Sequence, residues 1–186
     1  MDDLTRPEGR KSLEAFFSSF LKAFADYSTF PIRTGKRITI LADTLNGGLG
    51  PMVERFRSVF ADDVQIVSLD EVDIAGGCLG CLKCGPKNRC AYDGKDGVRD
   101  VYEQCIEPAD LYVMAATVHG RWYSSRMKMF VDRGFFHTHQ PFLVVKQDAV
   151  LLDGPVAGKS ELRDGLAGFF EWQGASPNGI ALNPVG

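Results

Sequence analysis

The 186-residue chain is long enough for one ordinary domain with a sizeable core, so no second core domain is needed. Its 45% hydrophobic residues, 24% charged residues and formal net charge of −3 exclude a disordered chain and argue against a nucleic-acid partner. The N-terminus lacks the apolar core of a signal peptide, and no run approaches the roughly 18 apolar residues of a membrane span, so we expect a cytoplasmic protein.

The first predicted element is an amphipathic helix over residues 11–29. Its apolar residues recur at helical spacing and form a strongly aromatic face: Leu13, Phe16, Phe17, Phe20, Leu21 and Phe24. The segment STFPIRTG then ends the helix. We expect residues 1–34 to be a helical extension whose aromatic face covers a bare face of the following sheet or contacts another subunit.

Residues 35–186 are predicted to alternate short apolar strands with helices. The expected strands are 37–42, 64–69, 111–116, 149–152 and 179–182, and the expected helices follow Pro51, span 98–106 and 124–133, and include Leu162 to Phe170. Cys105 is expected in the core because it shares the apolar face of its helix. The alternation predicts an α/β fold with an open parallel sheet, in which ligands bind beyond the carboxyl ends of the strands.

A glycine-rich loop, DTLNGGLG, separates the first predicted strand from its helix. Glycines let the backbone turn its N–H groups toward a ligand, polar side chains add hydrogen bonds, and the following helix N-terminus favours an anion. The candidate phosphate-binding residues are Thr44, Asn46, Gly47, Gly48 and Gly50. A plain turn between strand and helix is the alternative.

Four of the five cysteines lie in the stretch GCLGCLKCGPKNRC, with spacing C-x2-C-x2-C-x5-C. They are Cys78, Cys81, Cys84 and Cys90, within a predicted cysteine-rich loop at 76–95. In a reducing compartment such thiols hold a metal or perform redox chemistry more often than they form disulfides. The compact spacing favours a [4Fe–4S] cluster, with zinc as an alternative metal and a metal-free catalytic or idle thiol set as the remaining possibility.

The third loop at the predicted carboxyl edge is TVHGRWYSS, and we expect it to join the glycine loop and the cysteine loop in one site. Ser124 and Ser125 are expected to form the N-cap region of the next helix. In FFHTHQPF, His137 and His139 lie two residues apart, but no cysteine or carboxylate beside them completes a metal site. We therefore expect them at a surface or an interface.

Two stretches, GCLGCLKCGPKNRC and WYSSRMKMFVDRGFF, resemble the iron–sulfur flavoproteins within the flavodoxin-like NAD(P)H-dependent FMN reductase superfamily. With the strand order around them, the similarity covers roughly Arg37 to Ile180. It implies a three-layer, doubly wound, five-stranded parallel sheet of order 2-1-3-4-5. It also implies FMN phosphate at Thr44–Gly50, a metal cluster on the four cysteines, and isoalloxazine against Thr117, Val118, His119, Gly120, Arg121 and Trp122.

The resemblance further implies an oxidoreductase that moves electrons between FMN and a [4Fe–4S] cluster, with NAD(P)H or ferredoxin as donor. Related proteins are commonly dimers or tetramers, in which a cluster can approach the flavin of a neighbour. The chemistry would belong to the cofactors, so no catalytic triad is expected, although His119 is a candidate hydrogen-bond partner of the flavin. The alternatives are an FMN reductase with a structural zinc, a non-catalytic redox sensor or electron carrier, and a thiol oxidoreductase using Cys78 and Cys81.

Overall fold

The structure is a computed structural model that describes residues 11, 14, 15, 18, 31–137, 140–156, 159–174 and 176–183. Most of the predicted helix 11–29 therefore lies outside the described residues. Its four described members, Lys11, Glu14, Ala15 and Ser18, are helical and exposed. Among the described residues, no helix combines the length and apolar character that crossing a membrane requires.

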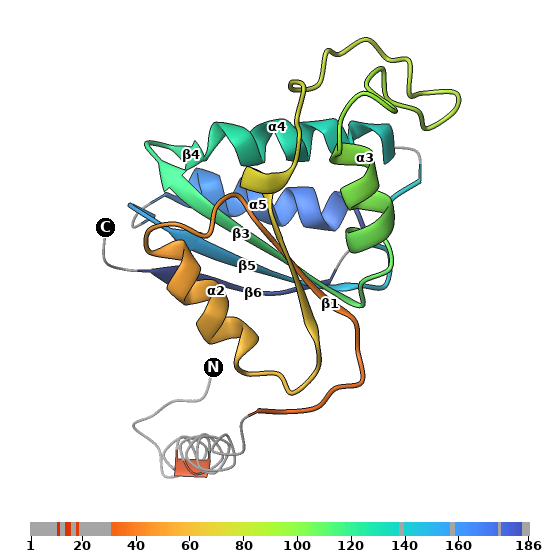
Figure 1. Ribbon diagram of the computed structural model, residues 1–186. Coiled ribbons are helices and arrows are strands. Elements are labelled where there is room, and N and C mark those ends of the chain that lie inside the picture. The colour runs from red at the N-terminus through yellow and green to blue at the C-terminus, as the bar shows by residue number, and fades with distance from the viewer. Residues whose placement is uncertain are drawn as a thin grey trace.

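A parallel sheet forms the centre of the molecule (Figure 1). Its strands are β1 (Ile38–Ala42), β2 (Val64–Ser68), β3 (Leu111–His119), β5 (Gln147–Asp153) and β6 (Ser176–Asn183), in the order β2-β1-β3-β5-β6. The short β4 (Trp122–Tyr123) pairs only with β3, in the antiparallel sense. With β4 set aside, the predicted order 2-1-3-4-5 is confirmed.

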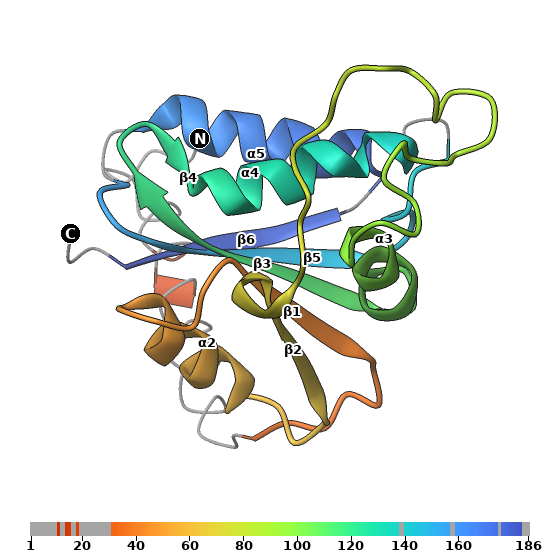
Figure 2. The same cartoon turned by 45° about the horizontal axis from the view of Figure 1, so that its top comes forward.

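Helices cover both faces of the sheet, as Figure 2 shows. One face carries α3 (Val98–Val101), the π-helix η2 (Tyr102–Ile106), α4 (Ser125–Arg133) and α5 (Ser160–Trp172), and the other carries α2 (Leu49–Arg57). The short 3-10 helices are η1 (Leu69–Glu71) and η3 (Gly134–His137). The larger core lies on the first face, where the Tyr102 ring stacks on Phe130 at 4.6 Å and meets Phe136 and Phe142 edge-on.

Strand β3 is longer than its sequence predicts. The expected strand ended at Ala116, but the structure continues it to His119 and folds it back on Trp122 and Tyr123. Gly120, with φ of +67°, makes this tight turn possible because glycine adopts positive φ without steric cost. Thr117, Val118 and His119 therefore lie on a strand and not, as predicted, in a loop.

Asp148 is a buried carboxyl on β5, opposite Tyr112 of β3 and on the face that α5 covers. Its Oδ1 has no hydrogen-bond partner among the described residues. Burial raises the pKa of Asp148 from 3.8 to about 6. The core therefore favours the protonated, neutral form of this side chain.

We expect the Asp148→Asn variant to change how stability depends on pH. A raised pKa means that the folded state binds the Asp148 proton more tightly than the unfolded chain does. The protonated side chain therefore contributes about 3 kcal/mol to the free energy of unfolding below about pH 4, and this contribution is lost as the pH rises through about 6. Urea unfolding of both proteins from pH 4 to 7 measures it, and the stability of the variant relative to the natural chain should rise across that range. Parallel pH profiles would contradict the assignment.

Candidate functional site

Three segments meet at the carboxyl edge of the sheet, on the side where α2 begins (Figure 1). They are the loop after β1, the β3–β4 hairpin and the end of β5. Thr117 links two of them, because its backbone N–H and its hydroxyl both donate to Asp43 Oδ2, at 2.9 Å and 2.7 Å. The predicted convergence of the first and third loops is therefore present.

The glycine loop after β1 has the backbone geometry that an anion site needs. Gly47 has φ of +66°, and a Cβ on Gly50 would lie 2.2 Å from the Leu45 carbonyl oxygen, so this position requires glycine. The N-cap residue of α2 is Gly48, which has no side chain to cap the helix, and the first turn of α2 holds no acidic residue. The first N–H groups of the helix are thus suited to a phosphate.

Carboxylates surround the same loop and oppose an anion there. A Cβ on Gly48 would lie 2.6 Å from the Asp153 carboxylate, which therefore lies directly against the start of α2. The Thr44 hydroxyl donates to Asp70 at 2.7 Å and accepts from the backbone and side-chain N–H groups of Asn46. Sequence reasoning missed Asp153 and Asp70, because Asp153 ends β5, Asp70 lies in η1 after β2, and no local pattern connects either residue with the loop.

The predicted flavin-side residues divide into exposed and structural positions. His119, Gly120 and Arg121 are exposed at the tip of the hairpin, whereas the Val118 side chain is buried in the core. Trp122 packs against α5 so closely that a Cβ on Gly165 would lie 2.5 Å from its ring. The side chains available to a ligand are therefore those of His119 and Arg121.

The start of α4 behaves as its sequence predicts. The Ser124 hydroxyl accepts a hydrogen bond from the Met127 N–H at 3.1 Å and caps the helix, which begins at Ser125. The neighbouring Tyr123 is buried and contacts the Trp122 ring. Ser124 therefore has a structural role.

The four clustered cysteines line one cavity with Arg133, Phe135 and Phe136. Cys78 and Cys81 are exposed, whereas Cys84 and Cys90 are half-buried. Burial raises the pKa of Cys84, and charge repulsion from the other three cysteines raises it further. Among the described residues, no group of three or more His, Cys, Asp or Glu side chains is arranged to hold a single metal ion.

Arg133 holds the cysteine loop in place from the end of α4. Its guanidinium binds both oxygens of Asp96, at 2.7 Å and 3.0 Å, and donates to the Gly76 carbonyl at 3.0 Å. It also lies over the Tyr92 ring, and both charged side chains of the pair are only 1% exposed. Sequence reasoning missed this residue, because an arginine in a last helical turn is also typical of a solvated helix end.

The cysteine cavity and the glycine loop lie near opposite ends of α4. The loop at 76–95 leaves the sheet edge, passes Met129 at Gly77 and reaches the C-terminal end of the helix (Figure 1). The nine residues of α4 span about 13 Å. The cysteine side chains therefore lie toward the end of α4 away from the hairpin, where Arg133 holds their loop, and the prediction that all three loops form one site stays a prediction.

Two other candidate residues have structural surroundings. His137 is largely buried among Tyr102, Phe136 and Phe142, and its Nε2 lies 2.8 Å from Glu107 Oε1, so the expected surface position is wrong. His139 lies outside the described residues. Cys105 is half-buried, packs against the core and accepts from Gln65 Nε2 at 3.3 Å, close to its predicted core role.

No protein-family model and no curated protein matches the sequence, but solved structures match its fold. The Trp repressor binding protein from Bacillus subtilis has a TM-score of 0.56 and 18% identity over 78% of this chain and 85% of its own. An NADH:FMN oxidoreductase in its apo form matches with a TM-score of 0.55 and 14% sequence identity, and the match covers 79% of this chain and 75% of that protein. A WrbA-like flavodoxin from Agrobacterium tumefaciens matches with a TM-score of 0.51 and 11% sequence identity, and the match covers 75% of this chain and 74% of that protein. The chain therefore has the flavodoxin-like fold, as predicted.

Proposed function

We propose that the protein is an FMN- and [4Fe–4S]-dependent oxidoreductase that moves electrons between a donor such as NAD(P)H or ferredoxin and an acceptor. The observation that carries this proposal is a cavity lined by four cysteines in a flavodoxin-like fold. One structural neighbour is an NADH:FMN oxidoreductase, which supports flavin chemistry on this architecture. When bound, FMN would exchange electrons in pairs and the cluster would exchange them singly.

The residues at the carboxyl edge fit FMN in part. The N–H groups at the start of α2 would hold the phosphate, and the exposed His119 and Arg121 would lie beside the isoalloxazine. The Asp153 carboxylate is the opposing feature, because it brings negative charge to the phosphate position. This chain would therefore bind FMN more weakly than a loop without such a carboxylate.

Ligand geometry favours a [4Fe–4S] cluster over a zinc ion, although the cysteine cavity has a volume of only about 20 Å³ and its loop would have to open to admit a cluster. The thiolates of such a cluster bind different irons, so their sulfurs need not converge on one point as zinc ligands do. The described side chains offer no convergent set for a single ion, yet all four thiols line the same cavity. The Gly80 N–H already lies 3.5 Å from Cys78 Sγ, and such N–H groups stabilise an anionic cluster.

The charge of Arg133 would have a second role beside the thiolates. Although burial opposes the charge, Asp96 and Cys90 raise the pKa of Arg133, so the side chain remains a cation at the cavity wall. A fixed cation there would balance negative charge on the thiolates and favour the reduced state of the centre. The dimer or tetramer implied by the resemblance stays a prediction, in which the cluster could approach the flavin of a neighbouring subunit.

Anaerobic purification followed by an absorbance spectrum and assays of iron, sulfide, zinc and FMN on one sample tests this function. We expect about four irons and four sulfides per chain, together with FMN. Zinc with FMN would instead identify a flavin reductase with a structural zinc, and a metal-free protein with one perturbed thiol would identify a thiol oxidoreductase. Both cofactors without NAD(P)H oxidation would favour a redox sensor or carrier.

We expect Asp153→Asn to strengthen FMN binding by about tenfold, because it removes one negative charge from the phosphate position. Flavin fluorescence titration measures the dissociation constant. Riboflavin is the control ligand, since it lacks the phosphate and its affinity should not change. Equal gains for both flavins, or no gain for FMN, would show that the phosphate does not bind beside Asp153.

A further inference from the structure

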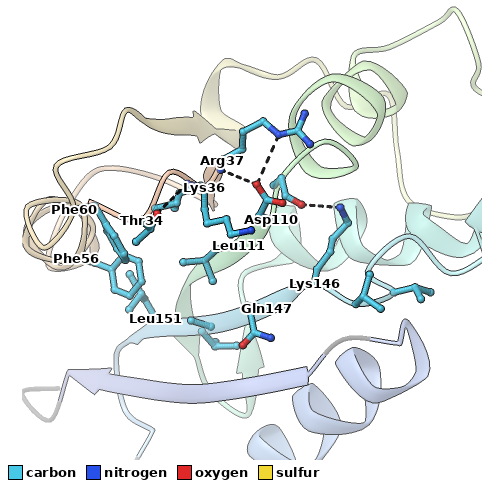
Figure 3. A pocket seen from close by; sticks show the side chains of 16 residues that line it. Thr34, Lys36, Arg37, Phe56, Phe60, Asp110, Leu111, Lys146, Gln147 and Leu151 are labelled. Atoms are coloured by element: carbon cyan, nitrogen blue, oxygen red, sulfur yellow. Dashed lines mark hydrogen bonds and ion pairs between the residues drawn. The ribbon is translucent and has the colours of Figure 1, made fainter. Parts of the chain in front are cut away.

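A cavity of about 800 Å³ opens at the amino-terminal ends of β1, β3 and β5, away from the glycine loop and the cysteines (Figure 3). It lies on the face of the sheet that α2 covers only in part. Figure 3 shows Phe56 and Phe60 toward one end of this space and Lys146 toward the other. Its apolar lining is Ile38, Phe56, Phe60, Leu111, Ala149 and Leu151.

Charged residues also line the cavity, namely Lys36, Arg37, Asp110 and Lys146. Lys146 Nζ donates to the carbonyl oxygens of Glu107 and Ala109, at 2.6 Å and 2.7 Å. The Asp110 carboxylate accepts from the Arg37 N–H at 2.9 Å and lies 3.9 Å from Arg37 Nε. Val144, half exposed, continues the apolar surface outward. The lining combines three cations and one carboxylate with a mainly apolar wall, and this wall suits an apolar occupant.

The N-terminal part of the chain arrives at the rim of this cavity. Ile32 forms a parallel bridge with Phe60, with hydrogen bonds of 2.8 Å to the Val59 carbonyl and 2.7 Å from the Ala61 N–H. The backbone N–H groups of Thr34 and Gly35 donate to the Asp62 carboxylate. Because Thr34 lines the cavity, the residues that precede Ile32 start directly beside it.

We propose that residues 11–29 of the same chain occupy this cavity and cover the face of the sheet beside α2. Lys11, Glu14, Ala15 and Ser18 are helical, exposed and spaced so that they share one side of a helix. In the sequence, the apolar residues recur at the positions that a continuous helix in this register would place on the opposite side: Leu13, Phe16, Phe17, Phe20, Leu21 and Phe24. A helix over 11–29 would be about 28 Å long, enough to cross β1, β3 and β5.

Nuclear magnetic resonance of the full chain tests this docking. In methyl-labelled protein we expect nuclear Overhauser effects between phenylalanine rings of residues 16–24 and the methyl groups of Leu111, Ala149 and Leu151. Phe20→Glu should shift these methyl resonances and raise the fluorescence of an added hydrophobic dye several-fold. Ser18→Glu, which changes the exposed side of the same helix, should leave both unchanged.

Three results would overturn the proposal. Absence of these contacts in the natural chain would mean that the segment lies elsewhere, whether or not the Phe20→Glu variant folds. Contacts that appear only between differently labelled molecules in a mixed sample would assign the cavity to the segment of a second copy. Equal responses to Phe20→Glu and Ser18→Glu would also contradict it, because the two sides of the helix would then be equivalent.

Discussion

Asp96→Asn is expected to lower the free energy of unfolding by about 3–5 kcal/mol. The substitution leaves the Arg133 guanidinium almost fully buried without its carboxylate partner, and an unpaired buried charge is among the most destabilising defects a core can carry. Urea unfolding followed by circular dichroism at pH 7 measures the loss. Asp132→Asn is the control, since it breaks an exposed pair with Lys128 on the same helix and should cost less than about 1 kcal/mol.

The pH dependence of the free energy of unfolding provides a second test of the Asp96–Arg133 pair. Burial alone would raise the pKa of Asp96, but Arg133 and the Ala75 N–H hold it below its ordinary value of 3.8. The stabilisation is therefore present above about pH 4 and is lost as the pH falls through the folded-state pKa. The natural chain should lose this contribution in acid while Asp96→Asn does not, and equal stabilities of the two at pH 7 would contradict a structural role for the pair.

The sheet could be predicted from the sequence because its strands are continuous apolar runs separated by helical patterns. ITILA (Ile38–Ala42) is buried throughout and LYVMAA is buried from Tyr112 to Ala116, so their β-branched and apolar residues identify these strands without any tertiary knowledge. The hairpin after β3 could not be predicted, because His119 and Trp122 are polar or half-exposed and pair only once Gly120 turns the chain. Tertiary context extended the strand where local pattern indicated a loop.

The candidate site shows the same division between local and long-range information. The cysteine spacing and the Ser124 cap are local features and were visible in the sequence. The pair Arg133 and Asp96 joins residues 37 positions apart, and Asp153 reaches the glycine loop from another strand, so neither contact has a local signature. These long-range contacts separate the cysteines from the glycine loop and give that loop its negative surroundings.

Because the cysteine cavity and the glycine loop lie near opposite ends of α4, we expect a cysteine substitution to affect metal binding and FMN binding differently. Cys84→Ser should abolish iron and sulfide binding almost completely, because in the proposed function all four thiolates that line the cavity would bind the cluster and one of them is lost. FMN content should stay near that of the natural chain, because the glycine loop lies near the other end of α4. Parallel assays of iron, sulfide and FMN after anaerobic purification measure both effects on one sample.

Cys105→Ser is the matched control for this variant, since Cys105 is the one cysteine outside the cluster and packs beside Gln65. It should keep its iron, its sulfide and its FMN. Full iron content in Cys84→Ser would show that Cys84 is not a ligand, and equal iron loss in both variants would show that serine acts by damaging the fold. Loss of iron together with FMN in Cys84→Ser alone would mean that the two sites depend on each other despite the length of α4 between them.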